Sequence, residues 1–339
     1  MSAYSTQYLN ENMFVGYVAE RGPAWWAENG QAKHQYEMDV PEKDVRELLW
    51  PWTAKKSTTM VETDSGEFMP LRDYRGKTRN ALVRSDNGMM LGIMGEGYPD
   101  HGYNERLLDN LTAILDGEVK IGSAGLLKGG AVGFVQMETP DTVVSAATGE
   151  KYRPFITGMS SFDGSLATGF KAGCTRIVCD NTFASFRSES GAQVKFKNTA
   201  NSAIKIATAR EALDILFETS TEFDQQVSKL LAQEVTAAQF DKILNLYIPV
   251  PEEKGKGQTQ AINSHDSIRM LYDTDERVAP WSGTEWGTLQ AFNTYEQHLT
   301  SLRGSMERLE RNTLNFLKGD RETADNQILA IIGGVLQDA

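Results

Sequence analysis

Short apolar runs separated by turns fill the middle of the chain. Residues 81–84 and 89–94 are two such runs, and they flank Ser85-Asp86-Asn87-Gly88. The Asn-Gly pair supplies the positive φ angles of a tight hairpin turn. Similar runs recur from residue 119 to residue 179, again with turns rich in glycine. This spacing predicts an antiparallel meander of strands.

One helical pattern interrupts the strands. Apolar residues recur at helical spacing from Leu107 to Leu115, after Asn104, a residue type that caps helix N-termini. We therefore expect one inserted amphipathic helix. The glycines between residues 122 and 133 are not followed by the Lys-Ser/Thr of a phosphate loop, so we expect them to mark bulges and close strand approaches.

The chain becomes helical after Asn181. Thr236 is a good N-cap for a helix that ends before Pro249-Val250-Pro251. The next residues, up to Gln258, contain two glycines and no apolar side chain, which predicts a flexible loop. Residues 324–336 form an apolar helix that either the core or another subunit must cover.

These patterns predict an α+β fold, in which an antiparallel meander sheet with an inserted helix is followed by a helical C-terminal half. We divide the chain into three regions. Residues 1–79 read as an irregular N-terminal segment whose tryptophans anchor it on a core, residues 80–188 as an antiparallel β-rich core, and residues 189–339 as a helical region with a flexible loop near 252–259.

Composition narrows the classes of function. The formal net charge of -12 argues against the broad basic surface of a duplex-DNA binder, but a local basic groove is compatible with it. The four histidines lie far apart and the two cysteines lie on opposite faces of a strand, so we expect no metal, no disulfide and no cofactor. No run approaches about 18 apolar residues and no signal-peptide pattern is present, which predicts a cytoplasmic protein without membrane contact.

Several segments together resemble one family. Arg176-Ile177-Val178-Cys179-Asp180-Asn181-Thr182 resembles the signature of an uncharacterised family of proteins carried by phages and plasmids. Tyr98-Pro99, the turn Ser161-Phe162-Asp163-Gly164-Ser165 and Gly283-Thr284-Glu285-Trp286 match further elements in the same order. The residues that match the family signature are Asp163, Gly164, Arg176, Cys179, Asn181, Thr182, Thr284 and Trp286.

The resemblance implies a mobile genetic element, the cytoplasm of a host cell, and a role close to DNA metabolism or counter-defence. It assigns no reaction. Phe162 stands where the family has a histidine, which removes a titratable group from that turn.

Basic and aromatic residues alternate along the β-rich region, and single-strand binders combine positive charge with rings on which bases stack. We therefore expect a non-enzymatic protein that binds single-stranded DNA, and anneals strands as a homo-oligomer. The candidate contacts are Lys128, Arg153, Lys171 and Arg176. The alternative is a counter-defence protein that binds a host immune or restriction protein through an acidic surface.

Catalysis is the third hypothesis. It would require Asp163, Asp180 or Cys179 to meet His298 in a pocket. Cys179 ends a β-branched run, where a buried and inert thiol is common, so we expect no catalytic residue.

Overall fold

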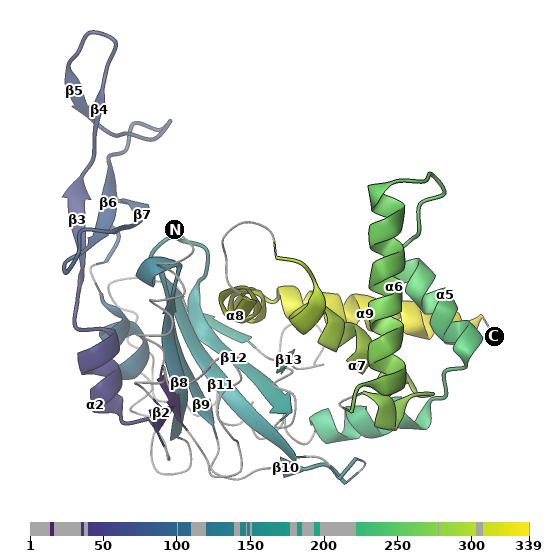
Figure 1. The fold of residues 1–339 in the computed structure, drawn as a ribbon. Helices are drawn as coiled ribbons and strands as arrows, with labels where there is room; N and C mark the ends of the chain where they lie inside the picture. Colours follow the sequence, from purple (N-terminus) through teal and green to yellow (C-terminus); the bar gives the residue numbers. More distant parts are fainter. Residues whose placement is uncertain are drawn as a thin grey trace. The chain divides into compact units, whose positions relative to one another are not determined.

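A computed structural model describes residues 14–16, 35–36, 40–99, 101–109, 120–138, 143–146, 148–149, 151–176, 182–184, 193–196, 222–276, 278–302 and 308–338. The chain divides into two compact units. Unit 1 comprises Met1–Asp141, Phe155–Ala172 and Glu189–Leu216, and unit 2 comprises Thr142–Pro154, Gly173–Ser188 and Phe217–Ala339. Antiparallel sheets occupy the N-terminal and middle parts and helices most of the C-terminal half, which confirms the α+β prediction (Figure 1).

The predicted meander is present. Its strands are β8 (Lys120–Leu127), β9 (Val132–Glu138), β11 (Lys151–Ser161) and β12 (Thr168–Arg176), which neighbour one another in chain order. In unit 1, β1 (Phe14–Gly16) pairs with β8, β2 (Gln35–Tyr36) with β1, and β14 (Gln193–Phe196) with β12. In unit 2, β10 (Val143–Val144) pairs with the start of β11 and β13 (Thr182–Ala184) with the end of β12.

A glycine shapes the β8–β9 pair. The register shifts between Ile121 and Ser123, at Gly122. A Cβ at Gly122 would lie 2.4 Å from the Glu138 side chain, which is far inside van der Waals contact. A larger residue at the bulge would therefore force the Glu138 side chain to move, which agrees with the close strand approach predicted for this segment.

A projecting set of strands lies ahead of the meander in the sequence. The predicted hairpin is confirmed as β6 (Arg79–Arg84) and β7 (Met90–Gly95), and β3 (Ala54–Thr58) pairs with β6. Beyond them in Figure 1 lies a second hairpin, β4 (Met60–Glu62) with β5 (Phe68–Pro70). We name residues 54–79 the arm.

Strands in the arm correct the prediction that residues 1–79 are irregular. The residues of β3 after Ala54, and all of β4 and β5, are exposed or half-buried. A strand shows alternation of apolar and polar residues only when one of its faces is buried. Backbone hydrogen bonds define these strands, so the hydrophobic pattern could not reveal them.

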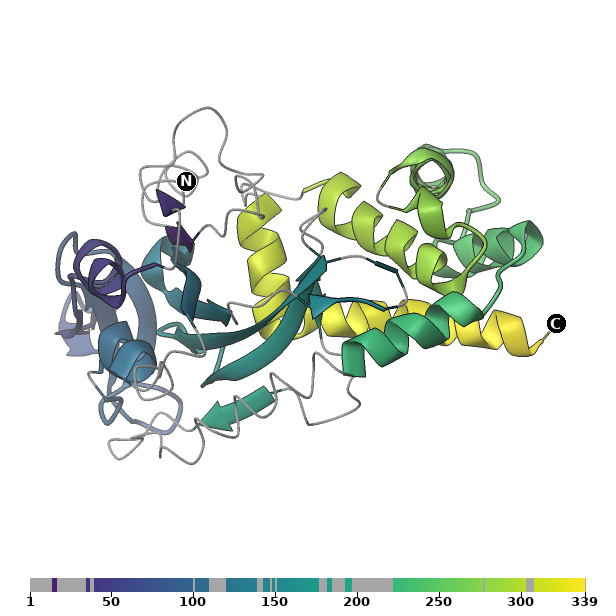
Figure 2. The ribbon, with the colours of Figure 1, turned by 90° about the horizontal axis from the view of Figure 1, so that it is seen from below.

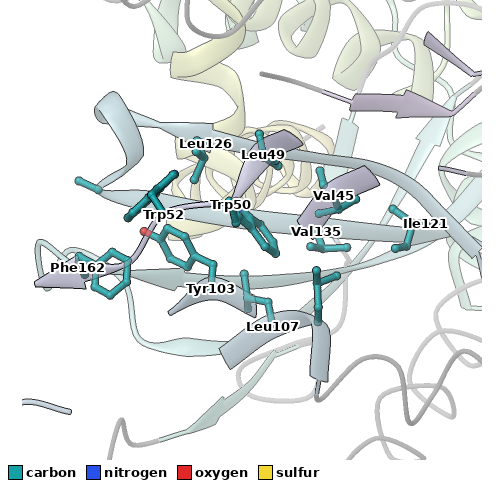
Figure 3. Packing of buried hydrophobic residues seen from close by; sticks show 14 of the residues in the cluster. Val45, Leu49, Trp50, Trp52, Tyr103, Leu107, Ile121, Leu126, Val135 and Phe162 are labelled. Carbon is teal, nitrogen blue, oxygen red and sulfur yellow. The ribbon is translucent and has the colours of Figure 1, made fainter. Parts of the chain in front are cut away.

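The core of unit 1 lies between the meander and two short helical segments, Glu42–Leu49 and Asn104–Leu108 (Figure 3). Trp50 and Trp52 are buried in it, which confirms the anchoring role predicted for these tryptophans, while Trp25 and Trp26 lie outside the described residues. Asn104 is not the N-cap, because it lies inside the helix and its amide donates to the Trp50 carbonyl at 3.1 Å.

Unit 2 is built mainly from helices: residues 222–232, α5 (Ala237–Tyr247), α6 (Lys256–Thr274), α7 (Glu285–Thr294), α8 (Arg308–Lys318) and α9 (Asp320–Gln337). The predicted N-cap is confirmed, since the Thr236 hydroxyl accepts from the backbone N–H of Gln239. Helix α9, yellow in Figure 2, contacts α5, α7 and α8. Its apolar face is buried in the unit 2 core, so the core covers the predicted C-terminal helix.

The loop predicted near 252–259 is shorter than expected. Helix α6 already begins at Lys256, and the backbone N–H of Thr259 donates to the Gly255 carbonyl at 3.1 Å. Gly257 falls in the first turn of the helix, where the backbone N–H groups lack intrahelical partners in any case. No helix among the described residues is long and apolar enough to cross a membrane.

Candidate functional site

The signature turn at residues 161–165 brings two predicted site residues together. Lys128 donates to the Asp163 carboxylate at 2.8 Å, and the backbone N–H of Ser165 donates to the other oxygen at 2.8 Å. Gly164 has a φ of +75°, which favours glycine. Burial would raise the pKa of Asp163, but the hydrogen bonds from Lys128 and Ser165 lower it below its usual value.

Aromatic packing in the core of unit 1 fixes the same turn. Phe162 is buried, 4.6 Å from the Tyr103 ring centroid, and the Arg106 guanidinium lies 4.8 Å from the Phe162 ring (Figure 3 labels both rings). Arg106 also donates to the Tyr98 hydroxyl at 2.9 Å, and that hydroxyl donates to the Ser161 carbonyl at 3.1 Å. These contacts give the Tyr98 and Asp163-Gly164 parts of the signature a structural role.

The other predicted nucleic-acid contacts are distributed between the two units. Lys128 and Lys171 belong to unit 1, and Arg153 and Arg176 to unit 2. Lys171 is only 2% exposed, so it is not part of the surface. Arg153 lies on β11 and Arg176 ends β12, but their side chains are outside the described set.

The remaining signature residues include two that begin helix α7. The Thr284 hydroxyl caps the helix by accepting from the Gly287 N–H at 3.0 Å, and Trp286 is fully buried in the unit 2 core. Thr182 begins β13, while Cys179 and Asn181 lie outside the described residues. This motif therefore forms the start of a helix.

The groups considered for catalysis belong to different units or lie outside the described residues. Asp163 belongs to unit 1 and His298 to unit 2, and Asp180 and Cys179 lie outside the described residues. Within the described part of the chain, no group of three or more His, Cys, Asp or Glu residues could hold a metal ion.

The arm contains a basic surface that the sequence reasoning missed. Its six Lys or Arg residues and four Asp or Glu residues give a formal charge of +2, whereas the whole chain has -12. The cations are Lys55, Lys56, Arg72, Arg75, Lys77 and Arg79. A count of charge in short windows would have found this reversal of sign.

We name residues 72–77 the basic loop, and Asp73 organises it. One carboxylate oxygen of Asp73 accepts from the backbone N–H groups of Arg75 at 2.9 Å and Lys77 at 3.0 Å. The other oxygen pairs with Arg79 at 2.8 Å. The only acidic group of the loop is thus used inside it, and its hydrogen bonds, that from the Lys77 N–H first, lower the pKa of Asp73.

The loop presents an aromatic ring surrounded by cations. Tyr74 is 89% exposed, and Arg72, Arg75 and Lys77 are also exposed. The Arg75 guanidinium lies 5.1 Å from the Tyr74 ring centroid. Among the described residues, neither Arg75 nor Lys77 forms an ion pair. A base and its phosphates would find ring faces and positive charge here within a few residues.

The conformation of the basic loop should depend on pH through Asp73. Because its pKa is lowered in the folded loop, the carboxylate stabilises the loop above the unfolded value of about 3.9 and this stabilisation is lost as the pH falls through the folded pKa. The protection of the Arg75 and Lys77 amides against hydrogen exchange, relative to the intrinsic rate at each pH, should decrease over that acidic range. In an Asp73→Asn variant the same exchange should lack this transition, and a transition of equal size there would contradict the role of Asp73.

The chain belongs to the family of the domain of unknown function (DUF932), whose model matches residues 90–316. The predicted membership of an uncharacterised family is confirmed. No curated protein and no solved structure matches the chain. The signature turn and the start of α7 lie inside the matched segment, whereas the arm precedes it.

Proposed function

We propose that this chain is a non-enzymatic protein of DNA metabolism that binds single-stranded nucleic acid through the basic loop. The observation that supports this most is the 89% exposed ring of Tyr74 between exposed arginine and lysine side chains. Base stacking on an exposed aromatic ring contributes about 1–3 kcal/mol per base, and it tolerates any sequence. The flanking cations would contact the phosphates on either side of the stacked base.

Charge distribution favours a single strand over a duplex as the ligand. A duplex presents two phosphate backbones to a broad surface, and a chain with net charge -12 would repel it. A single flexible strand can instead follow a narrow positive surface. The exposed Lys55 lies within the same arm and would extend this surface along β3.

The proposed nucleic-acid contact does not involve the residues that the sequence suggested. Lys128 already pairs with Asp163, and Lys171 is buried. The cations of the basic loop are exposed and lie beside an exposed ring, which is the combination that single-strand binding requires. As an extension of this proposal, the protein would be encoded by a phage or plasmid and would anneal strands as a homo-oligomer.

The alternative function is counter-defence, in which an acidic surface binds a host immune or restriction protein. It is supported by the charge outside the arm: removal of the arm's +2 leaves a formal charge of -14 on the rest of the chain. An acidic mimic of nucleic acid would not need the cations of the basic loop. Removal of those cations should therefore abolish the first function and leave the second unchanged.

Replacing Arg72, Arg75 and Lys77 together with Gln should reduce binding of a labelled single-stranded oligonucleotide, measured by fluorescence anisotropy. Each phosphate contact to a single strand contributes about 0.7 to the slope of log K against log salt. The slope should therefore fall by about 2. Tyr74→Ala should weaken binding by about 5- to 160-fold, the equivalent of one lost stack of about 1–3 kcal/mol, with little change in the slope.

The matched control replaces three exposed lysines of unit 2, Lys229, Lys254 and Lys256, with Gln, which gives the same change in net charge. This control should bind the oligonucleotide nearly as the unaltered chain does. An equal loss of binding in both triple variants would mean that net charge alone explains the effect. No binding by the unaltered chain at micromolar concentration would refute the proposed function and favour the acidic mimic.

A further inference from the structure

The β4–β5 hairpin exposes apolar side chains on both faces. Residues paired across the hairpin point to the same side, so Met60 and Phe68 lie on one face, and Val61 and Met69 on the other. All four side chains are between 46% and 65% exposed. Isolated two-stranded hairpins are marginally stable in water, and clustered exposed apolar groups mark interaction surfaces.

The edges of this hairpin are also available. Within the described residues, β4 and β5 form a sheet of their own and pair only with each other. Unpaired strand edges attract further strands unless they are covered. The hairpin therefore has the features of an element that is completed by another surface.

Charge is separated along the arm. The hairpin contains the acidic residues Glu62, Asp64 and Glu67, all exposed, and no Lys or Arg. The basic loop contains Arg72, Arg75 and Lys77 with the exposed ring of Tyr74, and its Asp73 is occupied internally. The same chain thus has an acidic apolar surface and a basic aromatic surface, which complement each other.

The two surfaces leave a common junction as separate branches. At this junction the backbone N–H of Leu71 donates to the Thr59 carbonyl at 2.8 Å, and the N–H of Arg79 donates to the Leu71 carbonyl at 2.8 Å. Thr59 also accepts from the Ala81 N–H through its hydroxyl. These hydrogen bonds hold the backbone at the point where the hairpin and the basic loop separate.

We infer that two copies of the chain associate through their arms, antiparallel about a two-fold axis. The hairpin of each copy contacts the basic loop of the other, so every contact occurs twice, as in an isologous dimer. The occupant is a second copy because the complementary charge and the exposed ring are present on this same chain. This inference concerns association in the absence of nucleic acid, and it goes beyond the proposed function.

Exchange of charges between two full-length variants tests the inference. One variant reverses the hairpin with Glu62→Lys, Asp64→Lys and Glu67→Lys, and the other reverses the basic loop with Arg72→Glu, Arg75→Glu and Lys77→Glu. Each variant alone opposes like charges and should have the mass of one chain by sedimentation or light scattering. An equimolar mixture restores both contacts and should have twice that mass, as should the unaltered chain at micromolar concentration.

Three outcomes would overturn the inference: a monomeric unaltered chain, a mixture that stays monomeric, or a dimer that persists in each variant alone. Phe68→Ser with Met69→Ser tests the apolar part, and it should weaken association at least tenfold. Both this variant and the hairpin-reversed variant retain the basic loop. Their oligonucleotide binding should persist, so that failure of the dimer and failure of nucleic-acid binding are distinguished.

Discussion

Phe162→Ala should lower the free energy of unfolding of unit 1 by about 3–5 kcal/mol, the usual effect of removing a buried aromatic ring. Phe162 is 1% exposed. Its ring packs 4.6 Å from Tyr103 and 6.2 Å from Trp52, and the Arg106 guanidinium lies on it at 4.8 Å. Truncation leaves a cavity, and the buried guanidinium of Arg106 loses its contact with the ring. Hydrogen exchange measured by mass spectrometry, resolved by unit, reports the loss.

The control for this prediction is Met90→Ala, a truncation in the same unit at a side chain that is 61% exposed. It should change the free energy of unfolding by less than about 0.5 kcal/mol, because the side chain is already hydrated in the folded chain. Similar effects of the two substitutions would mean that Phe162 is not part of the packed core.

Arg321→Leu should destabilise unit 2 by about 3–5 kcal/mol, because it leaves a buried carboxylate without its cation. Arg321 and Asp325 are 7% and 2% exposed, and they form an ion pair one helical turn apart on α9. The Asn293 amide donates to the same carboxylate at 3.2 Å. Denaturant unfolding, followed by the tryptophan fluorescence of unit 2, measures the change.

Two comparisons separate the lost ion pair from lost packing. Arg269→Leu removes the exposed partner of Asp241, a pair of the same type at 2.8 Å, and should cost no more than about 1 kcal/mol. Arg321→Leu combined with Asp325→Leu should recover much of the stability, because no charge is left buried. A double variant as unstable as the single one would contradict the electrostatic explanation.

The effect of Arg321→Leu should also depend on pH. Burial raises the pKa of Asp325, although Arg321 lowers it, so removal of Arg321 should raise the pKa further. Above that raised pKa the variant contains an uncompensated carboxylate and the full destabilisation is present. As the pH falls below it the carboxyl becomes neutral and the difference from the unaltered chain should decrease.

The contacts of Phe162 with Tyr103 and Arg106 explain the role of the signature turn. At this turn the chain has a buried ring, that of Phe162, which anchors Asp163 and Gly164 to the core of unit 1. The turn can therefore hold its shape without any proton transfer. The proposed nucleic-acid contact lies in the arm, before the segment matched by the family model, so it is a proposal for this chain and is not implied by the family.

The sequence alone determined the elements whose signals are local. The Asn-Gly turn predicted the β6–β7 hairpin, and Thr236 predicted a helix start, because turn and cap preferences depend on the few residues around them. The apolar pattern of residues 324–336 predicted α9, because helical spacing can be read within one short segment. Charge and aromatic content suggested nucleic-acid contacts that included Lys171, which is buried.

Only the tertiary structure decided which charged residues are exposed. Lys171 and Arg106 are buried although both are strongly polar, because their surroundings compensate them, and no local pattern indicates such compensation. The strands of the arm lack a buried face, so their apolar and polar residues show no periodicity. Local hydrogen bonds to Asp73 hold the basic loop, but the exposure of Tyr74 and of the cations beside it is visible only in the folded chain.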